Sequence, residues 1–222
     1  MSASALADRL AAGAQALGVA LSPPQQDQLL SYLALIQKWN QVYNLTAVRD
    51  PQEMLSHHLL DSLAVIPPLR RHTAGRPLRL LDVGSGAGLP GVVVAICCPE
   101  LTVDCVDTVG KKAAFIQQVA LTLKLPHLRG LHERVERLPG PYDVILSRAF
   151  ASLADFVSGS GAALGEGGVW LAMKGKHPAQ EIAAVRPGVD VFHVEPLQVP
   201  GLSAERCIVW MRPRPAQPDG SA

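Results

Sequence analysis

The sequence predicts an α/β fold in which a mostly parallel sheet ends in an antiparallel hairpin and follows a helical extension. Three observations predict it. From Leu78 onward, apolar runs of strand length alternate with runs of helical periodicity, as expected for right-handed crossovers in a parallel sheet. A glycine-rich turn over 84–91 follows the first strand. The last two strand candidates are separated only by the short turn 200–203, which predicts a hairpin.

The first 70 residues are predicted to be helical. An amphipathic helix is expected over 3–17. Ser22 and Gln25 form a capping box that begins the second helix, with proline in its first turn. Asp50 begins a third helix, whose apolar stripe is expected to end at the prolines 67–68. These helices form an extension ahead of the sheet.

The remaining elements follow in alternation. Strands are expected at 79–83, 102–106, 128–132, 142–147 and 168–174. Helices are expected between them at 90–98, 110–124, 152–164 and 177–185. The hairpin strands are 189–199 and 205–212. We therefore divide the chain into a helical extension over 1–70, a sheet-forming domain over 71–212 and a proline-rich tail over 213–222 that is expected to be disordered.

Composition excludes several classes of protein. The 222 residues carry a formal net charge of +1 and are 48% hydrophobic, which argues against global disorder and an overall polycation. Nucleic acid would have to bind a local basic patch. No apolar run reaches the roughly 18 residues of a membrane span, and the N-terminus lacks a signal-peptide pattern. We therefore expect a soluble, cytoplasmic protein that does not contact a membrane.

Cysteines and histidines give no metal-site pattern. The four cysteines, Cys97, Cys98, Cys105 and Cys207, do not form paired C-x-x-C motifs and are expected to be buried in a reducing compartment. The histidine pair 57–58 has no third ligand at a usable spacing and is expected on a helix surface. We therefore expect no metal.

The glycine-rich turn fits two cofactors. Gly86, Gly88 and Gly91 match the G-x-G-x-x-G pattern of dinucleotide-binding folds. Gly84, Gly86 and Gly88, preceded by Asp82, also match the pattern of S-adenosylmethionine-dependent methyltransferases. A third interpretation is a tight turn that binds no ligand.

Acidic residues and the hairpin favour the methyltransferase. Asp107 closes the second strand, where its carboxylate would accept hydrogen bonds from ribose hydroxyls in either case. Asp82 at the mouth of the first strand would repel a pyrophosphate but suits the cationic sulfonium amino acid. A seventh, antiparallel strand in a terminal hairpin is the usual end of the methyltransferase fold.

Arg148 is the leading candidate for a residue that contacts both cofactor and substrate. It follows the apolar fourth strand, and ligands of open α/β sheets bind outside the carboxyl ends of strands. The alternative is a surface salt bridge. The Asn/Asp-Pro-Pro-Tyr motif of exocyclic amine methylation is absent here, and no cysteine nucleophile lies nearby for pyrimidine C5 methylation.

Other candidates are weaker on sequence alone. Residues 133–136 would flank an adenine or form a solvated charge run. Tyr43 and Phe150 are candidates for base stacking, whereas Trp39 is expected in the core. A basic rim or scattered surface charge would be formed by Lys111, Lys112, Arg129, Arg134, Arg137, Lys174 and Lys176.

Several motifs together resemble the glucose-inhibited division protein B (RsmG) methyltransferases. The resemblance runs from about residue 20 to 212, and its most specific parts are 44–46 and 148–150. The remaining matching segments are 38–43, 48–51, 58–62, 82–91, 107–111, 147–153 and 173–175. The chain departs from the family at Lys112 and Ala113, where arginines are more frequent, and in its proline-rich tail.

The resemblance implies a class I (Rossmann-like) methyltransferase fold with a seven-stranded sheet. It implies transfer of a methyl group from S-adenosyl-L-methionine to N7 of a guanine in the decoding-region loop of 16S rRNA. The partner would be the small ribosomal subunit, and we expect a monomer. The implied cofactor contacts are Gly84, Leu89, Val135, Glu136 and Arg148. Gly86, from the glycine pattern, and Asp107, which matches the acid of the family's second strand, complete the expected site.

N7 methylation fits the residues present, because guanine N7 carries a lone pair and no proton, so that no general base is required. We expect Arg148 to position cofactor and guanine, since O6 beside N7 accepts hydrogen bonds from a guanidinium. Asn44, Thr46 and the N-terminal helices are expected to dock RNA, so that deletion of residues 1–40 would abolish RNA methylation and spare cofactor binding. The alternatives are an NAD-dependent oxidoreductase, an inactive RNA-binding module of the same fold, and a small-molecule methyltransferase.

Overall fold

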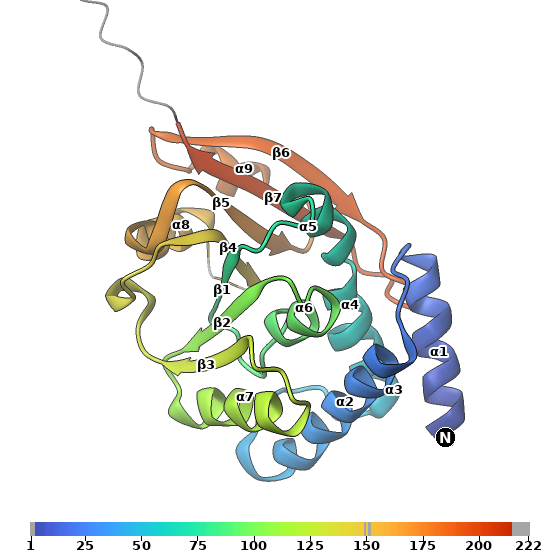
Figure 1. The fold of residues 1–222 in the computed structure, drawn as a ribbon. Helices are drawn as coiled ribbons and strands as arrows, with labels where there is room; N and C mark the ends of the chain where they lie inside the picture. Colours follow the sequence, from blue (N-terminus) through green and yellow to red (C-terminus); the bar gives the residue numbers. More distant parts are fainter. Residues whose placement is uncertain (1–2, 149, 151, 215–222) are drawn as a thin grey trace, which may run out of the picture.

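A computed structural model describes residues 3–148, 150 and 152–214. Its centre is a seven-stranded sheet in the order β3-β2-β1-β4-β5-β7-β6 (Figure 1). All neighbouring strands are parallel except β7, which pairs antiparallel with both β5 and β6. The strands are β1 Arg79–Val83, β2 Thr102–Asp107, β3 Leu128–His132, β4 Tyr142–Arg148, β5 Leu164–Lys174, β6 Val189–Leu197 and β7 Arg206–Pro213. The predicted alternation and the terminal hairpin are confirmed.

Helices cover both faces of this sheet. Those ahead of β1 are α1 Ala3–Ala16, α2 Pro23–Tyr43, α3 Pro51–Met54, the π-helical segment η1 Leu55–Leu60, α4 Asp61–Leu63 and α5 Ile66–Thr73. The crossovers carry α6 Gly91–Cys97, α7 Gly110–Thr122, the 3-10 turn η2 Val135–Arg137, α8 Leu153–Ser160, the 3-10 turn η3 Gly161–Ala163 and α9 Ala179–Ala183. None of these helices, within the described residues, has the length and hydropathy needed to cross a membrane.

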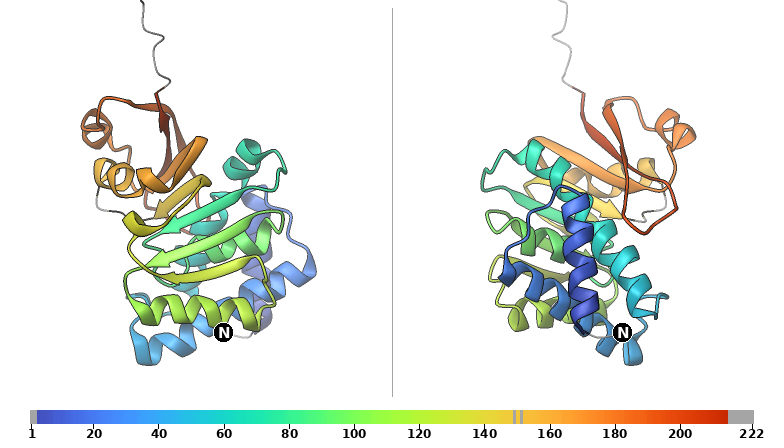
Figure 2. Two further views of the ribbon diagram at one scale, coloured as in Figure 1. Left: turned by 60° about the vertical axis from the view of Figure 1, so that its left-hand side comes forward. Right: turned by 90° about the vertical axis from the view of Figure 1, so that its right-hand side faces the viewer.

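The two faces are covered unequally. The helices that precede β1 lie on the same side as α6 and α7, whereas α8 and α9 lie on the opposite side (Figure 2). One buried cluster joins α1, α2 and α6 to the sheet through side chains such as Leu29, Ile36 and Val103. A second, smaller cluster includes Phe156 of α8 and Ile145 of β4. The N-terminal helices are therefore part of the main core and not a separate layer.

Local signals account for most helix boundaries. The Ser22 hydroxyl accepts the Gln25 backbone N–H, and the Gln25 side chain accepts the Ser22 backbone N–H, so the predicted capping box is confirmed. The expectation that the prolines at 67–68 end the third helix was wrong, because α4 already ends at Leu63. They lie in the first turn of α5, where proline is tolerated because its N–H would be unpaired anyway.

The sequence also made predictions about the start of β5, the four cysteines and the C-terminal tail. β5 begins at Leu164 rather than at 168, because Leu164 already pairs with Tyr142 of β4, ahead of a register shift that precedes the pairing of Val169 with Val144. All four cysteines are buried and free, as expected. The predicted tail falls mostly outside the described residues, although Pro213 itself still belongs to β7.

Candidate functional site

The glycine-rich turn connects β1 to α6 at the carboxyl edge of the sheet. Gly84 and Gly86 have φ values of 66° and 59°, a left-handed conformation that favours glycine. The Gly86 N–H donates to the Asp107 carboxylate at 3.0 Å, which ties the turn to the end of β2. A Cβ at Gly91 would collide with the side chains of Cys105 and Asp82, so this position needs glycine for close packing.

Asp82 lies beneath this turn and is fully buried. Its Oδ2 accepts the Gly91 backbone N–H at 2.8 Å, and burial raises the pKa of the carboxyl to about 7. Among the described residues, its Oδ1 and the buried Ser85 hydroxyl have no hydrogen-bond partner. Asp82 would therefore repel a pyrophosphate less than the sequence suggested, because the acid is buried below the turn and burial disfavours its charged form.

A cavity of about 410 Å³ lies beside the end of β2, and we call it the Asp107 cavity. Asp107 accepts backbone N–H groups from Gly86 and Val109, at 3.0 and 2.9 Å, and forms an ion pair with Lys112 at 3.5 Å. These contacts orient the carboxylate and leave it further lone pairs for hydroxyl donors. The cavity is lined by Val83, Gly84, Val106, Asp107, Thr108, Val109, Lys112, Glu133, Arg134, Val135, Glu136 and Phe150.

The structure brings together only part of the predicted cofactor set. Gly84, Asp107, Val135 and Glu136 line the Asp107 cavity. The remaining three do not: Gly86 donates a hydrogen bond to Asp107, Leu89 is buried in the main core, and Arg148 lines a different cavity. Glu136 pairs with Arg134 at 3.4 Å on the surface, so the predicted charge run is also present here.

A second cavity, of about 420 Å³, lies at the carboxyl ends of β4 and β5, and we call it the Arg148 cavity. The Arg148 guanidinium donates to Asp61 Oδ2 and to the His57 carbonyl, both at 2.9 Å. Asp61 is 2% exposed, and its Oδ1 accepts from Arg206 at 2.8 Å. Arg148 therefore does form a salt bridge, as the alternative interpretation expected, but the partner is buried and the pair faces a cavity. Its lining consists of Val48, His57, His58, Asp61, Arg148, Met173, Lys174, Gly175 and Arg206.

The expectation that the histidine pair lies on a helix surface was wrong for His58. Its side chain is 5% exposed, and its Nε2 lies 2.9 Å from the Thr46 hydroxyl. Burial, followed by the nearby charge of Arg148, lowers the pKa of His58 to about 4, so the ring is neutral at physiological pH. Thr46 in turn receives the Val48 N–H and donates its own N–H to Asn40. The 44–46 motif therefore supports the wall of the Arg148 cavity.

Sequence reasoning missed Asp61 and Arg206 as site residues. Asp61 and Ser62 interrupt an apolar helical stripe, and a carboxylate on a buried face requires a partner, which was the available signal. Arg206 gave no such signal, because it follows the polar turn before β7.

The predicted basic residues do not share one location. Lys112 and Arg134 line the Asp107 cavity, and Lys174 lines the Arg148 cavity, where it pairs with Glu181 at 2.7 Å. Arg129 lines neither cavity and pairs with Asp104. The stacking candidates also differ. Phe150 lines the Asp107 cavity, whereas Tyr43 is 38% exposed at the end of α2 and contacts the partly buried Trp39.

Comparison with known proteins decides between the cofactor classes. The family profile described as "rRNA small subunit methyltransferase G" (GidB) matches residues 25–209. The chain belongs to the GidB family. A GidB-family relative from Paracidovorax citrulli is 64% identical over 225 residues, covering 96% of this chain and 93% of that protein. Another, from Acidovorax sp. (strain JS42), is 68% identical over 209 residues, covering 90% and 92%. Both are named "Ribosomal RNA small subunit methyltransferase G".

Solved structures support the class I methyltransferase fold of this GidB-family chain. Magnesium protoporphyrin IX methyltransferase from Synechocystis, with bound SAM, aligns with a TM-score of 0.59 at 12% identity, covering 81% of this chain and 96% of that chain. TrmN from Thermus thermophilus aligns with a TM-score of 0.56 at 22% identity, covering 72% and 53%. These likenesses concern the fold. The described residues contain no cluster of three potential metal ligands.

Proposed function

We propose that this protein transfers a methyl group from S-adenosyl-L-methionine to N7 of a guanine in the decoding-region loop of 16S rRNA. The observation that carries the proposal is the pair of cavities at the carboxyl ends of neighbouring strands. The Asp107 cavity lies beside β1 and β2, and the Arg148 cavity lies at the end of β4, which pairs with β1. Strand order reverses between β1 and β4, where open α/β sheets bind their ligands.

The Asp107 cavity fits the nucleoside part of the cofactor. Asp107 is oriented by two backbone N–H groups and retains acceptor capacity for a ribose diol. Val135 offers an apolar wall, and Phe150 an aromatic one, beside the planar ring of an adenine. The unpaired buried oxygens of Asp82 and Ser85 are available acceptors below the glycine turn. When bound, the cofactor supplies a methyl group on a cationic sulfur.

The Arg148 cavity fits a guanine edge. Two guanidinium groups, from Arg148 and Arg206, line it, and O6 of guanine accepts from such donors. N7 carries no proton, so the cavity needs no base. His58 is neutral and hydrogen-bonded to Thr46, and Asp61 is held by two arginines, so these groups orient the site rather than move a proton. The chain's contribution to rate is then mainly alignment.

RNA docking by the N-terminal region remains part of the proposal, but the deletion suggested by the sequence does not test it. Residues 1–40 contain Leu29, Tyr32 and Ile36, which are fully buried in the main core. Their removal would expose one face of the sheet and destabilise the whole fold. The exposed side chains Val42 and Tyr43 at the end of α2 offer a milder test. Their replacement by serine should weaken RNA methylation and leave cofactor affinity unchanged.

The deciding experiment uses the purified protein, radiolabelled S-adenosylmethionine and unmodified small ribosomal subunits. After the reaction the rRNA is digested and the labelled nucleoside is identified. We expect label in 7-methylguanosine at a single position. Subunits that have first been methylated with unlabelled cofactor serve as the matched substrate control and should accept no label. Label in another nucleoside, in protein, or in neither would refute the proposal.

A further inference from the structure

Asp61 joins three parts of the chain that are far apart in sequence. It lies at the start of α4, directly after the π-helical segment η1, and it reaches Arg148 at the end of β4 and Arg206 at the start of β7. Each of its oxygens accepts from a different guanidinium, at 2.9 and 2.8 Å. The Asp61 side chain is 3% exposed, whereas the Arg148 and Arg206 side chains are 22% and 23% exposed.

The topology explains why a carboxylate is needed here. β4 and β7 lie on either side of β5, so Arg148 and Arg206 extend from strands that do not touch one another. A guanidinium on a long side chain is mobile unless it is held, and two guanidiniums in one cavity repel each other. A single buried acceptor between them fixes both positions and cancels one of the two positive charges.

The charged side chains of the Arg148 cavity carry a net positive charge, which suits a polar ligand with hydrogen-bond acceptors. Lys174 is neutralised by Glu181, so Arg148, Arg206 and Asp61 together leave one uncompensated positive charge. Arg148 also donates to the His57 carbonyl, which anchors the same guanidinium to the helical region. The orientation of the site is thus set from the N-terminal helices, through Asp61 and His57.

We propose that Asp61 is the positioning residue of this site and that it acts through Arg148 and Arg206 without touching either reactant. The inference rests on the proposed function and adds the residue that aligns its two arginines. A displacement of about 1 Å in a site that works by alignment lowers the rate roughly 100-fold. Loss of the carboxylate should therefore slow methyl transfer while leaving the Asp107 cavity intact.

The test compares Asp61→Asn with Asp104→Asn in the full-length protein. Asp104 is also a buried carboxylate held by arginines, but it lines neither cavity, which makes it the matched control. We expect Asp61→Asn to lower the single-turnover rate on small subunits at least about 10-fold, with less than about threefold change in affinity for S-adenosylhomocysteine measured by calorimetry. Asp104→Asn should lower the melting temperature and leave the rate of the folded protein unchanged.

A double-mutant cycle separates positioning from a general structural role. If Asp61 acts through Arg148, the Asp61→Asn effect should largely vanish in an Arg148→Ala background. Additive losses, or a wild-type rate for Asp61→Asn, would overturn the inference. If Asp61→Asn does not fold, Asp61→Glu keeps the charge but misplaces it, and the same cycle is run with that variant. Failure of the wild-type protein to form 7-methylguanosine would refute the proposed function instead, so the two failures are distinguishable.

Discussion

Two buried carboxylates, each held by two arginines, serve different purposes in this molecule. Asp61 holds Arg148 and Arg206 beside a cavity. Asp104 accepts two hydrogen bonds from Arg129, at 2.7 and 2.6 Å, and lies 3.7 Å from an Arg79 nitrogen. None of the three Asp104-cluster residues lines the Arg148 or Asp107 cavity. The same set of side chains can therefore either position ligands or fasten strands.

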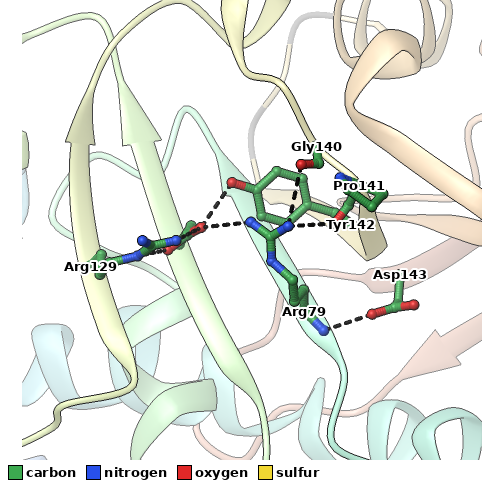
Figure 3. Close-up of polar contacts among 7 residues, drawn as sticks. Arg79, Arg129, Gly140, Pro141, Tyr142 and Asp143 are labelled. Atoms are coloured by element: carbon green, nitrogen blue, oxygen red, sulfur yellow. Dashed lines mark hydrogen bonds and ion pairs between the residues drawn. The ribbon is translucent and has the colours of Figure 1, made fainter.

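The partners of each carboxylate explain this difference. The Asp104 cluster joins adjacent strands, since Arg79, Asp104 and Arg129 lie on β1, β2 and β3. Figure 3 shows the polar contacts of Arg79 and Arg129. The Tyr142 hydroxyl from β4 donates to Asp104 at 2.8 Å, and the Arg79 guanidinium lies 4.6 Å from the ring centroid of the same tyrosine. This carboxylate accepts three hydrogen bonds from the protein and lines neither cavity, so it is not placed to receive a ligand there. The Asp61 cluster instead bridges separated strands, and each of its arginines keeps an N–H donor that pairs with none of the described residues.

The largest expected effect comes from breaking the strand-fastening cluster. Asp104→Ala leaves the buried Tyr142 hydroxyl without its acceptor, at about 1–3 kcal/mol, and removes two hydrogen bonds from the half-exposed Arg129, each worth about 1 kcal/mol, for a combined loss of more than about 3 kcal/mol. Denaturant unfolding measures the loss, while the methylation rate per folded molecule should stay at the wild-type level. A stability loss below about 1 kcal/mol would show that the cluster does not fasten the sheet.

The second largest effect is expected in the pH dependence of stability, which should differ between the surroundings of the two clusters. The pKa of His58, beside Arg148, falls to about 4 from 6.5, so between these values the unfolded chain binds the extra proton and stability rises with pH. The effect amounts to about 3 kcal/mol, from roughly 1.4 kcal/mol per pKa unit. His58→Gln should remove this rise. Burial raises the pKa of Tyr142, whose hydroxyl donates to Asp104, to about 12, so this group contributes no slope near neutral pH.

The buried Asp82 changes stability with pH in the opposite direction to His58, so the two contributions must be measured separately. Its pKa is raised to about 7 from 3.8, so the native state holds the proton and stability falls as pH rises between these values. Unfolding is therefore measured from pH 4 to 7 in Asp82→Asn with and without His58→Gln. Parallel curves for the two proteins would contradict the assigned pKa of His58.

Arg148→Ala should lower the rate roughly 100-fold, equivalent to about 2.7 kcal/mol in the barrier, because the site loses its alignment. Arg129→Ala is the matched control from the other cluster: it should lower stability and leave the rate unchanged. Single-turnover methylation of small subunits and denaturant unfolding are measured on both variants. A wild-type rate and cofactor affinity for Arg148→Ala would remove this residue from the site.

The sequence predicted the sheet well because its signals are local. Apolar runs, the capping box and the turn at 200–203 each specify their own element. The Asp107 cavity was partly predictable for the same reason, since Asp107 ends a strand beside a glycine turn. The Asp61 cluster was not, because it depends on β5 separating β4 from β7 and on which face of η1 and α4 is buried. Long-range pairing of this kind leaves no spacing pattern in one sequence.

The smallest loss of stability is expected when Asp104 loses only its hydrogen bond from Tyr142. Tyr142→Phe removes one hydrogen bond but keeps the ring beside the Arg79 guanidinium and leaves both Arg129 hydrogen bonds in place. Because Asp104 remains paired, the loss should be about 1 kcal/mol rather than the larger cost of an orphaned charge. Unfolding of this variant beside Asp104→Ala gives the comparison. An equal loss in both would mean that the tyrosine, and not the arginine, holds the carboxylate, and that strand-fastening here depends on a neutral donor.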